Sequence, residues 1–216
     1  MNLSLSSSPT LLQTHALHME RNDEPLFSNL ELSVLPGQVL QIEGRNGSGK
    51  TTLLRILCGL TLPTSGEVRW NKRNIRECYP DFVTDLCYVG HVPGVKGDLT
   101  PLENLEFFRA GRQRRTGITA EHALERLGLP AECEEIPCRR LSAGQQRRVA
   151  LARLLITEAR LWILDEPFTA LDPQGRDTVE SLLAEHLAAD GLAVVTTHHV
   201  MAFEHGEVIK LDLSDD

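Results

Sequence analysis

The sequence predicts an α/β fold built on a largely parallel sheet with helices between its strands. Two observations predict it. Short apolar runs, typical of buried strands, alternate along the chain with stretches of helical periodicity, and a glycine-rich loop joins one apolar run to a helix. The composition agrees, since 41% of the 216 residues are hydrophobic and 24% are charged. These are ordinary globular values, which exclude intrinsic disorder as the main state.

The first third of the chain is expected to contain three strands and one helix. The first dozen residues, rich in Ser, Leu and Thr, are expected to form a loose tail. Next comes a segment in which apolar and polar residues alternate, and then a short apolar run that ends at Gly44. A helical stretch follows, with Gly59 and Pro63 as its stop signals. The expected strands are Leu30–Val34, Val39–Ile42 and Thr64–Trp70, and the expected helix is Lys50–Leu57.

The middle of the chain, from about Thr100 to Leu129, differs in character. Its apolar residues have helical spacing and its arginines cluster at Arg112, Arg114 and Arg115, so it is interpreted as a helical insert. Beyond it, strands that are apolar on both faces indicate a buried parallel sheet. The expected helices there are Ser142–Thr157 and Val179–Ala189, and the expected strands are Leu161–Leu164, Ala193–Thr197 and Glu207–Leu211.

The charge and hydropathy exclude several classes of protein. Lys plus Arg is 22 and Asp plus Glu is 30, so the net charge is −8, which disfavours nucleic acid as a partner. No apolar run approaches the length of a membrane span. Met1–Leu12 has no positively charged side chain and no proper apolar core, so it is not read as a secretory signal. The protein is expected in the cytosol, without lipid insertion, and any work at a membrane requires a partner.

Five cysteines occur, at positions 58, 78, 87, 133 and 138. The number is odd and no CxxC is present. Cys133 and Cys138 could in principle hold a metal, but no second pair or histidine lies at zinc-finger spacing. Reduced thiols in a cytosolic protein are the favoured interpretation.

A phosphate-binding loop is predicted where the apolar run Val39–Ile42 meets the helix. Successive backbone N–H groups of a glycine-rich loop can turn toward one anion, and the helix N-terminus adds its positive dipole end. Lysine supplies a fixed charge for the β and γ phosphates, and the threonine hydroxyl can ligate Mg²⁺. The alternative is a turn that only links strand to helix. The predicted ATP-binding residues are Gly44, Arg45, Asn46, Gly47, Ser48, Gly49, Lys50, Thr51 and Thr52.

An acidic pair ends the apolar strand Leu161–Leu164. Asp165 and Glu166 lie where open α/β sheets bind their ligands, at the carboxyl end of a strand. Asp165 is predicted to hold Mg²⁺ together with Thr51. Glu166 is predicted to be the catalytic residue that accepts a hydrogen bond from an attacking water. The alternative is that the pair caps the turn at Pro167.

Another motif precedes the helix expected at Ser142–Thr157. Ser142 can cap this helix and Gln145 can complete a capping box, and a Ser and a Gly at a helix N-terminus can also form an anion site. The segment Leu141–Gln145 reads LSxGQ and lies about 20 residues before the strand that ends at Asp165. Together with the glycine-rich loop and the acidic pair, this motif makes nearly the whole chain resemble the ABC-type ATPases. By this resemblance, the signature motif is Ser142, Ala143, Gly144 and Gln145, the D-loop contains Asp172, and His198 is the catalytic switch histidine.

The resemblance implies a P-loop NTPase with ATP and Mg²⁺ as cofactors. Its fold has a RecA-like core sheet flanked by helices, a small antiparallel β part and a helical subdomain, here about residues 98–157 of a single ATP-binding domain covering 1–216. Two such domains pack head to tail, so that each ATP lies between the loop of one copy and the signature of the other. A homodimer is therefore implied.

Two positions depart from the family pattern. The loop after the third core strand usually carries a Gln, and here that position is His91, whose imidazole can still meet a water, Mg²⁺ or the γ-phosphate. Adenine often stacks on an aromatic ring about where Arg21 stands, and a guanidinium can also stack on a base.

Three segments resemble a narrower group, the ATP-binding subunits of the bacterial cytochrome c maturation complex, also called the haem exporter. They are Gln41–Gly44, Tyr88–Lys96 and Leu99–Leu105, taken together with Leu141–Leu154 and Leu161–Asp172. This resemblance implies a peripheral protein on the cytoplasmic face of the inner membrane, coupling ATP hydrolysis to haem export or to release of a haem-loaded chaperone. The implied partners are integral-membrane permease subunits, CcmB with CcmC, CcmD and the haem chaperone CcmE beyond. A soluble scaffold ATPase, for example in iron–sulfur assembly, and an importer subunit for another solute are the alternatives.

Overall fold

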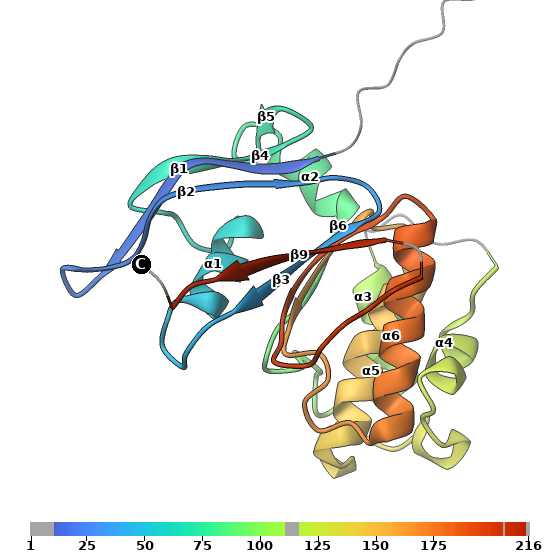
Figure 1. Ribbon diagram of the computed structural model, residues 1–216. Helices are drawn as coiled ribbons and strands as arrows, with labels where there is room; N and C mark the ends of the chain where they lie inside the picture. Colours follow the sequence, from blue (N-terminus) through green and yellow to red (C-terminus); the bar gives the residue numbers. More distant parts are fainter. Residues whose placement is uncertain (1–10, 111–116, 205, 215–216) are drawn as a thin grey trace, which may run out of the picture.

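The computed structural model describes residues 11–110, 117–204 and 206–214. Within these ranges the chain forms two sheets and two groups of helices (Figure 1). The parallel sheet has the order β6 (Leu86–Val89), β7 (Leu161–Asp165), β8 (Leu192–Thr196), β3 (Gln38–Glu43) and β9 (Glu207–Asp212). The antiparallel sheet has the order β2 (Glu24–Val34), β1 (Leu12–Arg21), β4 (Ser65–Trp70) and β5 (Arg73–Asn74).

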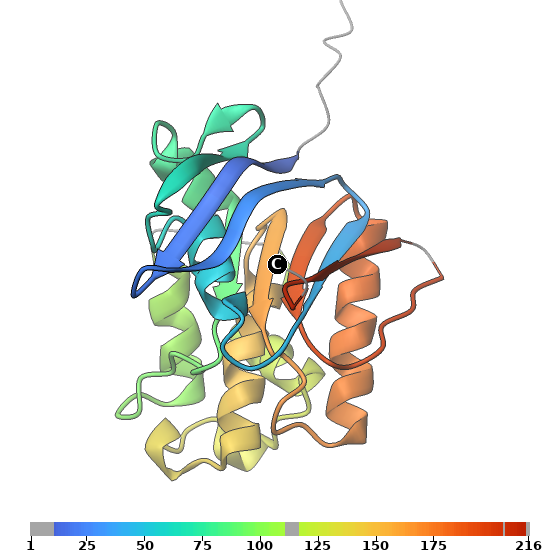
Figure 2. The same ribbon diagram turned by 60° about the vertical axis from the view of Figure 1, so that its left-hand side comes forward.

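The helices lie on opposite faces of the parallel sheet. In both views α1 lies between the two sheets, whereas the longer helices α5 and α6 cover the far face (Figure 2). The helices of the described residues are α1 (Lys50–Leu57), α2 (Tyr79–Asp85), α3 (Pro101–Arg109), α4 (Ala120–Arg126), α5 (Ala143–Ile156) and α6 (Pro173–Ala188), with short 3₁₀ turns at Ala131–Cys133 and Cys138–Arg140.

Strand alternation divides the core into two layers. Along β7, Leu161 and Ile163 pack with α1 and the antiparallel sheet, while Trp162 and Leu164 pack with α5 and α6. Successive side chains of a strand point to opposite faces, so a strand covered by helices on both sides must be apolar throughout. This explains why the central strands contain continuous apolar runs.

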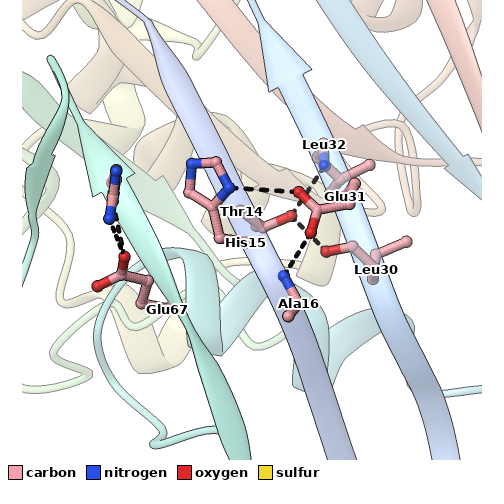
Figure 3. Close-up of polar contacts among 8 residues, drawn as sticks. Thr14, His15, Ala16, Leu30, Glu31, Leu32 and Glu67 are labelled. Carbon is pink, nitrogen blue, oxygen red and sulfur yellow. Dashed lines mark hydrogen bonds and ion pairs between the residues drawn. The ribbon is translucent and has the colours of Figure 1, made fainter.

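The antiparallel sheet bends over α1 through an irregularity in β1. The β1–β2 register shifts between Thr14 and Leu17, and Ala16 has a left-handed φ of 45°. Side chains replace part of the hydrogen-bond ladder there (Figure 3): Thr14 Oγ1 donates to the Leu30 carbonyl at 2.8 Å and accepts from the Leu32 amide at 2.9 Å. Glu31 accepts from the Ala16 amide at 2.6 Å. A bulge of this kind increases strand bending.

The elements agree with the sequence prediction for four strands of the parallel sheet, whereas β6 was not among the expected strands, and they differ for the antiparallel part. The predicted helices at Lys50 and Ser142 are confirmed, with Ser142 and Thr157 as the caps of α5. The strand expected at Leu30–Val34 begins six residues earlier, at Glu24, and β1 was not predicted because polar and apolar residues do not alternate cleanly across its bulge.

Three further expectations need correction or lie outside the described residues. The tail was expected to extend to Leu12, but β1 begins there, and the rest of that prediction, residues 1–10, is not described. The helix expected at Val179–Ala189 begins at Pro173, because Asp172 caps it and proline is tolerated in a first helical turn. In the middle region two helices are confirmed, while Arg112, Arg114 and Arg115 lie outside the described residues.

The cysteines are buried and unbridged. All five are free thiols, and burial raises the pKa of Cys58 and Cys138. Protonated buried thiols are poor ligands and poor nucleophiles. Among the described residues no group of three His, Cys, Asp or Glu side chains could hold a metal ion.

Candidate nucleotide site

The parallel topology brings the predicted motifs to one edge of the sheet. Asp165 at the end of β7 pairs with Thr196 of β8, and Thr196 pairs with Ile42 of β3. On the other side β6 pairs with β7 up to Val89 and Leu164. The loops that leave β6, β7, β8 and β3 therefore start beside one another, although they are far apart in the sequence.

The glycine-rich loop joins β3 to α1 and requires glycine at several positions. Gly44, Gly47 and Gly49 have φ of 144°, 90° and 96°, in the region that favours glycine. A Cβ on Gly44 would lie 2.7 Å from Ser48 Oγ, and one on Gly49 would lie 3.2 Å from Leu26 Cβ of β2. The loop is thus tightly curved and packed beneath the antiparallel sheet.

Lys50 at the start of α1 folds back over this loop. Its ammonium donates to the Gly44 carbonyl at 2.7 Å and to the Arg45 carbonyl at 3.0 Å. An ammonium has three donors, so these two bonds leave one for a phosphate oxygen. The charge is therefore held at the mouth of the loop.

Asp165 is almost fully buried, at 2% exposed, and is fixed by two hydroxyls. Its Oδ2 accepts from Thr51 Oγ1 at 2.9 Å, and its Oδ1 accepts from Thr196 Oγ1 at 2.7 Å. The Ser48 hydroxyl of the loop is also buried and has no partner within the described part of the chain. Carboxylate and hydroxyl oxygens are the ligands that Mg²⁺ prefers, so these residues fit the predicted cation.

Glu166 follows Asp165 with an unusual backbone. Its φ is 50°, a left-handed value that is uncommon for a residue other than glycine. Its amide donates to the Thr196 carbonyl at 3.1 Å and to Thr196 Oγ1 at 3.0 Å, and its carbonyl accepts from Arg147 at 2.6 Å. The strand β7 therefore ends at Asp165, and the backbone turns at Glu166. Strained backbone of this kind concentrates at functional sites.

The two adjacent histidines after β8 have different surroundings. His198 is exposed. His199 is partly buried, pairs with Glu180 of α6, and its ring lies 4.8 Å from that of Phe168. His199 therefore has a packing role, and the switch role of His198 stays a prediction. His91, just after β6, is also exposed.

The signature residues line a different surface, around the N-terminus of α5. Ser142 and Gln145 form the predicted capping box, and a Cβ on Gly144 would lie 2.7 Å from the Ala170 carbonyl, so this close approach requires glycine. Asp172 caps α6 and pairs with Arg148 at 2.6 Å. An open hollow results, lined by Gly128, Pro130, Ser142, Gly144, Gln145, Arg148, Ala170 and Asp172, and no residue of the glycine-rich loop lines it.

Sequence reasoning missed two residues that hold the site together. Thr196 contacts both Asp165 and Glu166, and Arg147 contacts the backbone that follows β7. The position of Thr196 at the end of an apolar run was a usable signal, because parallel strands end at a common edge. For Arg147 the sequence offered none, since an arginine near a helix N-terminus is usually exposed.

The geometry is that of an ATPase, and the comparisons agree. Residues 27–169 match the ABC transporter family. The chain belongs to this family, and it is an ATP-hydrolysing enzyme of the ABC type with a nucleotide as its ligand.

Curated relatives narrow the assignment within the family. The chain is 47% identical to the "Cytochrome c biogenesis ATP-binding export protein CcmA" of Nitrosococcus oceani, over 96% of this chain and 94% of the relative. Identity to the protein of the same name from Methylococcus capsulatus is 47%, over 97% of this chain and all of the relative. Identity to that of Pseudomonas syringae pv. tomato is 49%, over 92% of each chain.

Solved structures show the same fold. A dimeric bacterial ABC transporter cassette has a TM-score of 0.77 and 28% identity, over 94% of each chain. A dimeric cassette in a post-hydrolysis state with ADP and Pi has the same TM-score and 26% identity, over 93% of this chain and 94% of that one. The expected core of parallel sheet and helices, with its antiparallel part, is thereby confirmed.

His91 gives a first prediction for this site. If its exposed imidazole contacts the γ-phosphate or a water near it, His91→Gln should retain ATPase turnover, because an amide can make the same contact. His91→Leu should lower turnover on the order of a hundredfold, the lower range for a lost polar contact to a reacting group. Steady-state ATPase assays of the three proteins test this, and equal turnover in all of them would make His91 a surface turn residue only.

Proposed function

We propose that this chain is the ATP-hydrolysing subunit of a membrane ABC complex for cytochrome c biogenesis. Hydrolysis there is coupled to haem export or to release of a haem-loaded chaperone. The observation that carries the ATPase site is the Thr51–Asp165 hydrogen bond, which joins segments 114 residues apart into one phosphate and cation site. The names of the curated relatives support the biological context.

ATP binding is the task of the glycine-rich loop and Lys50. The loop residues Gly44–Thr52 surround the phosphates with backbone N–H groups, and the Lys50 ammonium neutralises the β and γ oxygens. Thr51 and Asp165 would hold Mg²⁺, which when bound neutralises charge on the phosphate oxygens. The buried Ser48 hydroxyl supports a ligand at this position, because a buried polar atom without a partner is costly.

Hydrolysis is the task of Glu166, with His198 and His91 beside the γ-phosphate. The Glu166 carboxylate accepts a hydrogen bond from the attacking water and holds it in line with the phosphorus. His198 leaves the adjacent strand β8 at the same edge and holds the γ-phosphate, and His91 senses the phosphate or the cation from β6.

A second copy of the chain completes each site. The signature residues Ser142–Gln145 line a hollow that contains none of the glycine-rich loop, so one copy cannot enclose a nucleotide between both motifs. In a head-to-tail homodimer the signature of one copy faces the ATP held by the other, with Asp172 near the dimer axis. That similar cassettes are dimeric supports this arrangement.

We further propose that residues 1–216 form a single ATP-binding domain, with a helical subdomain at about residues 98–157. In this proposal the domain is attached to the cytoplasmic face of the bacterial inner membrane. Among the described residues no helix combines the length and the hydropathy needed to cross a bilayer. Attachment in this proposal goes through integral-membrane permease subunits of the cytochrome c maturation complex, which the names of the curated relatives support.

Fractionation of bacterial cells tests this function. With its membrane subunits present, the chain should pellet with membranes, and deletion of those subunits should move it to the supernatant. Cells in which Glu166→Gln replaces the native copy should lose haem attachment to c-type cytochromes. A chain that stays soluble beside the intact membrane subunits would indicate a scaffold ATPase. Normal haem attachment in the mutant cells would indicate a subunit that serves another solute.

A further inference from the structure

Arg147 is a buried cation of α5 that contacts two separate loops at the nucleotide edge. Its side chain is only 3% exposed. Nη2 donates to the carbonyl oxygens of Asp165 at 2.7 Å and Glu166 at 2.6 Å, and Nε donates to that of Pro167 at 3.3 Å. Nη1 donates to the carbonyl oxygen of Gly90 at 2.7 Å. One planar guanidinium thus joins the turn after β7 to the loop after β6.

The partners of this cation are backbone dipoles. Within the described residues Arg147 forms no ion pair with a carboxylate, while burial lowers its pKa and the nearby Asp165 and Glu166 oppose that shift. An arginine stays charged under these conditions. Its fork of fixed donors can satisfy several carbonyls at once, which the flexible single ammonium of a lysine cannot reproduce.

The backbone of Glu166 is held from both sides. Thr196 binds its amide, whereas Arg147 and the Thr169 amide, at 3.2 Å, bind its carbonyl. A left-handed conformation at a residue with a Cβ costs free energy and persists only where its surroundings enforce it. Arg147 provides the charged hydrogen bond among these contacts, and charged bonds are the stronger ones.

The same side chain connects three proposed parts of the mechanism. Gly90 immediately precedes His91, and Arg147 lies on the helix that Ser142 caps. Arg147 lies five positions after Ser142, which is about 7.5 Å along a helix that rises about 1.5 Å per residue. The guanidinium therefore fastens the signature end of α5 to Glu166 and to the His91 loop.

We propose that Arg147 is a positioning residue for ATP hydrolysis, which holds the Glu166 backbone in its left-handed turn and fixes it relative to the His91 loop. The inference rests on the proposed role of Glu166 in orienting the attacking water. A misplacement of about 1 Å in a reacting group can cost on the order of a hundredfold in rate. ATP binding depends on Lys50 and the glycine-rich loop, which Arg147 does not contact in the described structure.

Two substitutions test the proposal. Arg147→Met keeps length and removes every donor, so turnover should fall by about tenfold or more while ATP affinity changes by less than about threefold. Arg147→Lys keeps the positive charge but loses the planar set of donors, so its turnover should lie between that of the wild type and that of Arg147→Met. Full turnover in either variant would overturn the proposal. If the methionine variant does not fold, the lysine variant carries the same comparison.

Arg153 supplies a matched control on the same helix. It is also buried, at 9% exposed; it donates to the carbonyl oxygen of Gly94 at 2.7 Å, in the loop after β6, and its guanidinium lies over the Phe108 ring of α3. Arg153→Met should lower thermal stability as Arg147→Met does, with turnover per folded molecule within about threefold of wild type. Equal losses of turnover in the two variants would show that Arg147 only stabilises the fold.

A double-mutant cycle with Glu166→Gln shows whether Arg147 acts through Glu166. Single-turnover hydrolysis by Glu166→Gln should fall no further when Arg147→Met is added, because groups that act as one unit are not additive. If the two losses multiply, Arg147 acts elsewhere and this inference fails while the site assignment stands. If Glu166→Gln alone hydrolyses ATP normally, the proposed role of Glu166 fails first, and this inference with it.

Discussion

Glu166→Gln is expected to bind ATP at least as well as the wild type, while its turnover falls on the order of a hundredfold, the lower range for loss of a general base. Glutamine keeps the size of the side chain and removes its negative charge and its basic oxygen. Loss of this charge also lessens repulsion against the triphosphate. None of the groups proposed for binding, namely Lys50, Thr51, Asp165 and the loop amides, is altered.

Persistent ATP should also make the dimer of Glu166→Gln visible. Gel filtration with ATP and Mg²⁺ should show a dimer, and with ADP a monomer. Glu158→Gln is the matched control, because Glu158 is an exposed glutamate in the connection between α5 and β7, and it should behave as the wild type does. Normal hydrolysis by Glu166→Gln would show that the assigned role in water activation is wrong. An inactive variant that remains monomeric with ATP would indicate that dimerisation requires the membrane subunits, and the measurement then belongs in that complex.

Lys50→Ala is expected to abolish measurable hydrolysis with the fold intact. Its ammonium is fixed over the loop by the Gly44 and Arg45 carbonyls, so its removal takes away a preorganised charge on the phosphates. Loss of one such group costs on the order of a hundredfold to a thousandfold in rate. Alanine is a good helix former, so α1 should keep its start.

Measurements of ATP affinity and of thermal stability show whether Lys50→Ala loses the phosphate contact or the fold. ATP affinity should fall together with turnover, whereas Glu166→Gln should lose turnover only. Thermal unfolding should stay close to that of the wild type. Lys72 is an exposed lysine in the turn between β4 and β5, so Lys72→Ala should change neither ATP affinity nor turnover. A Lys50→Ala protein with near wild-type turnover would exclude the glycine-rich loop as the phosphate site.

Much of the fold and of the candidate site could be predicted because local chemistry carries the information. The loop Gly44–Thr51 needs glycines for its left-handed turns, and the apolar run before it and the periodic helix after it are readable as they stand. Continuous apolar runs such as Leu161–Leu164 arise because β7 is covered on both faces. The capping box at Ser142 is a local hydrogen-bond pattern, so it too was visible in the sequence.

The sequence by itself determined the class of protein, the order of most of its core elements and the residues proposed to carry its chemistry. Only the tertiary structure decided how β1 and β2 form a sheet over the loop, because bulges and side-chain hydrogen bonds in that sheet interrupt the alternation on which strand prediction depends. It also showed that His199 contacts Glu180 and Phe168, contacts that the sequence alone does not indicate. It also showed Arg147 beneath Glu166, because that contact joins loops that only the parallel sheet brings together.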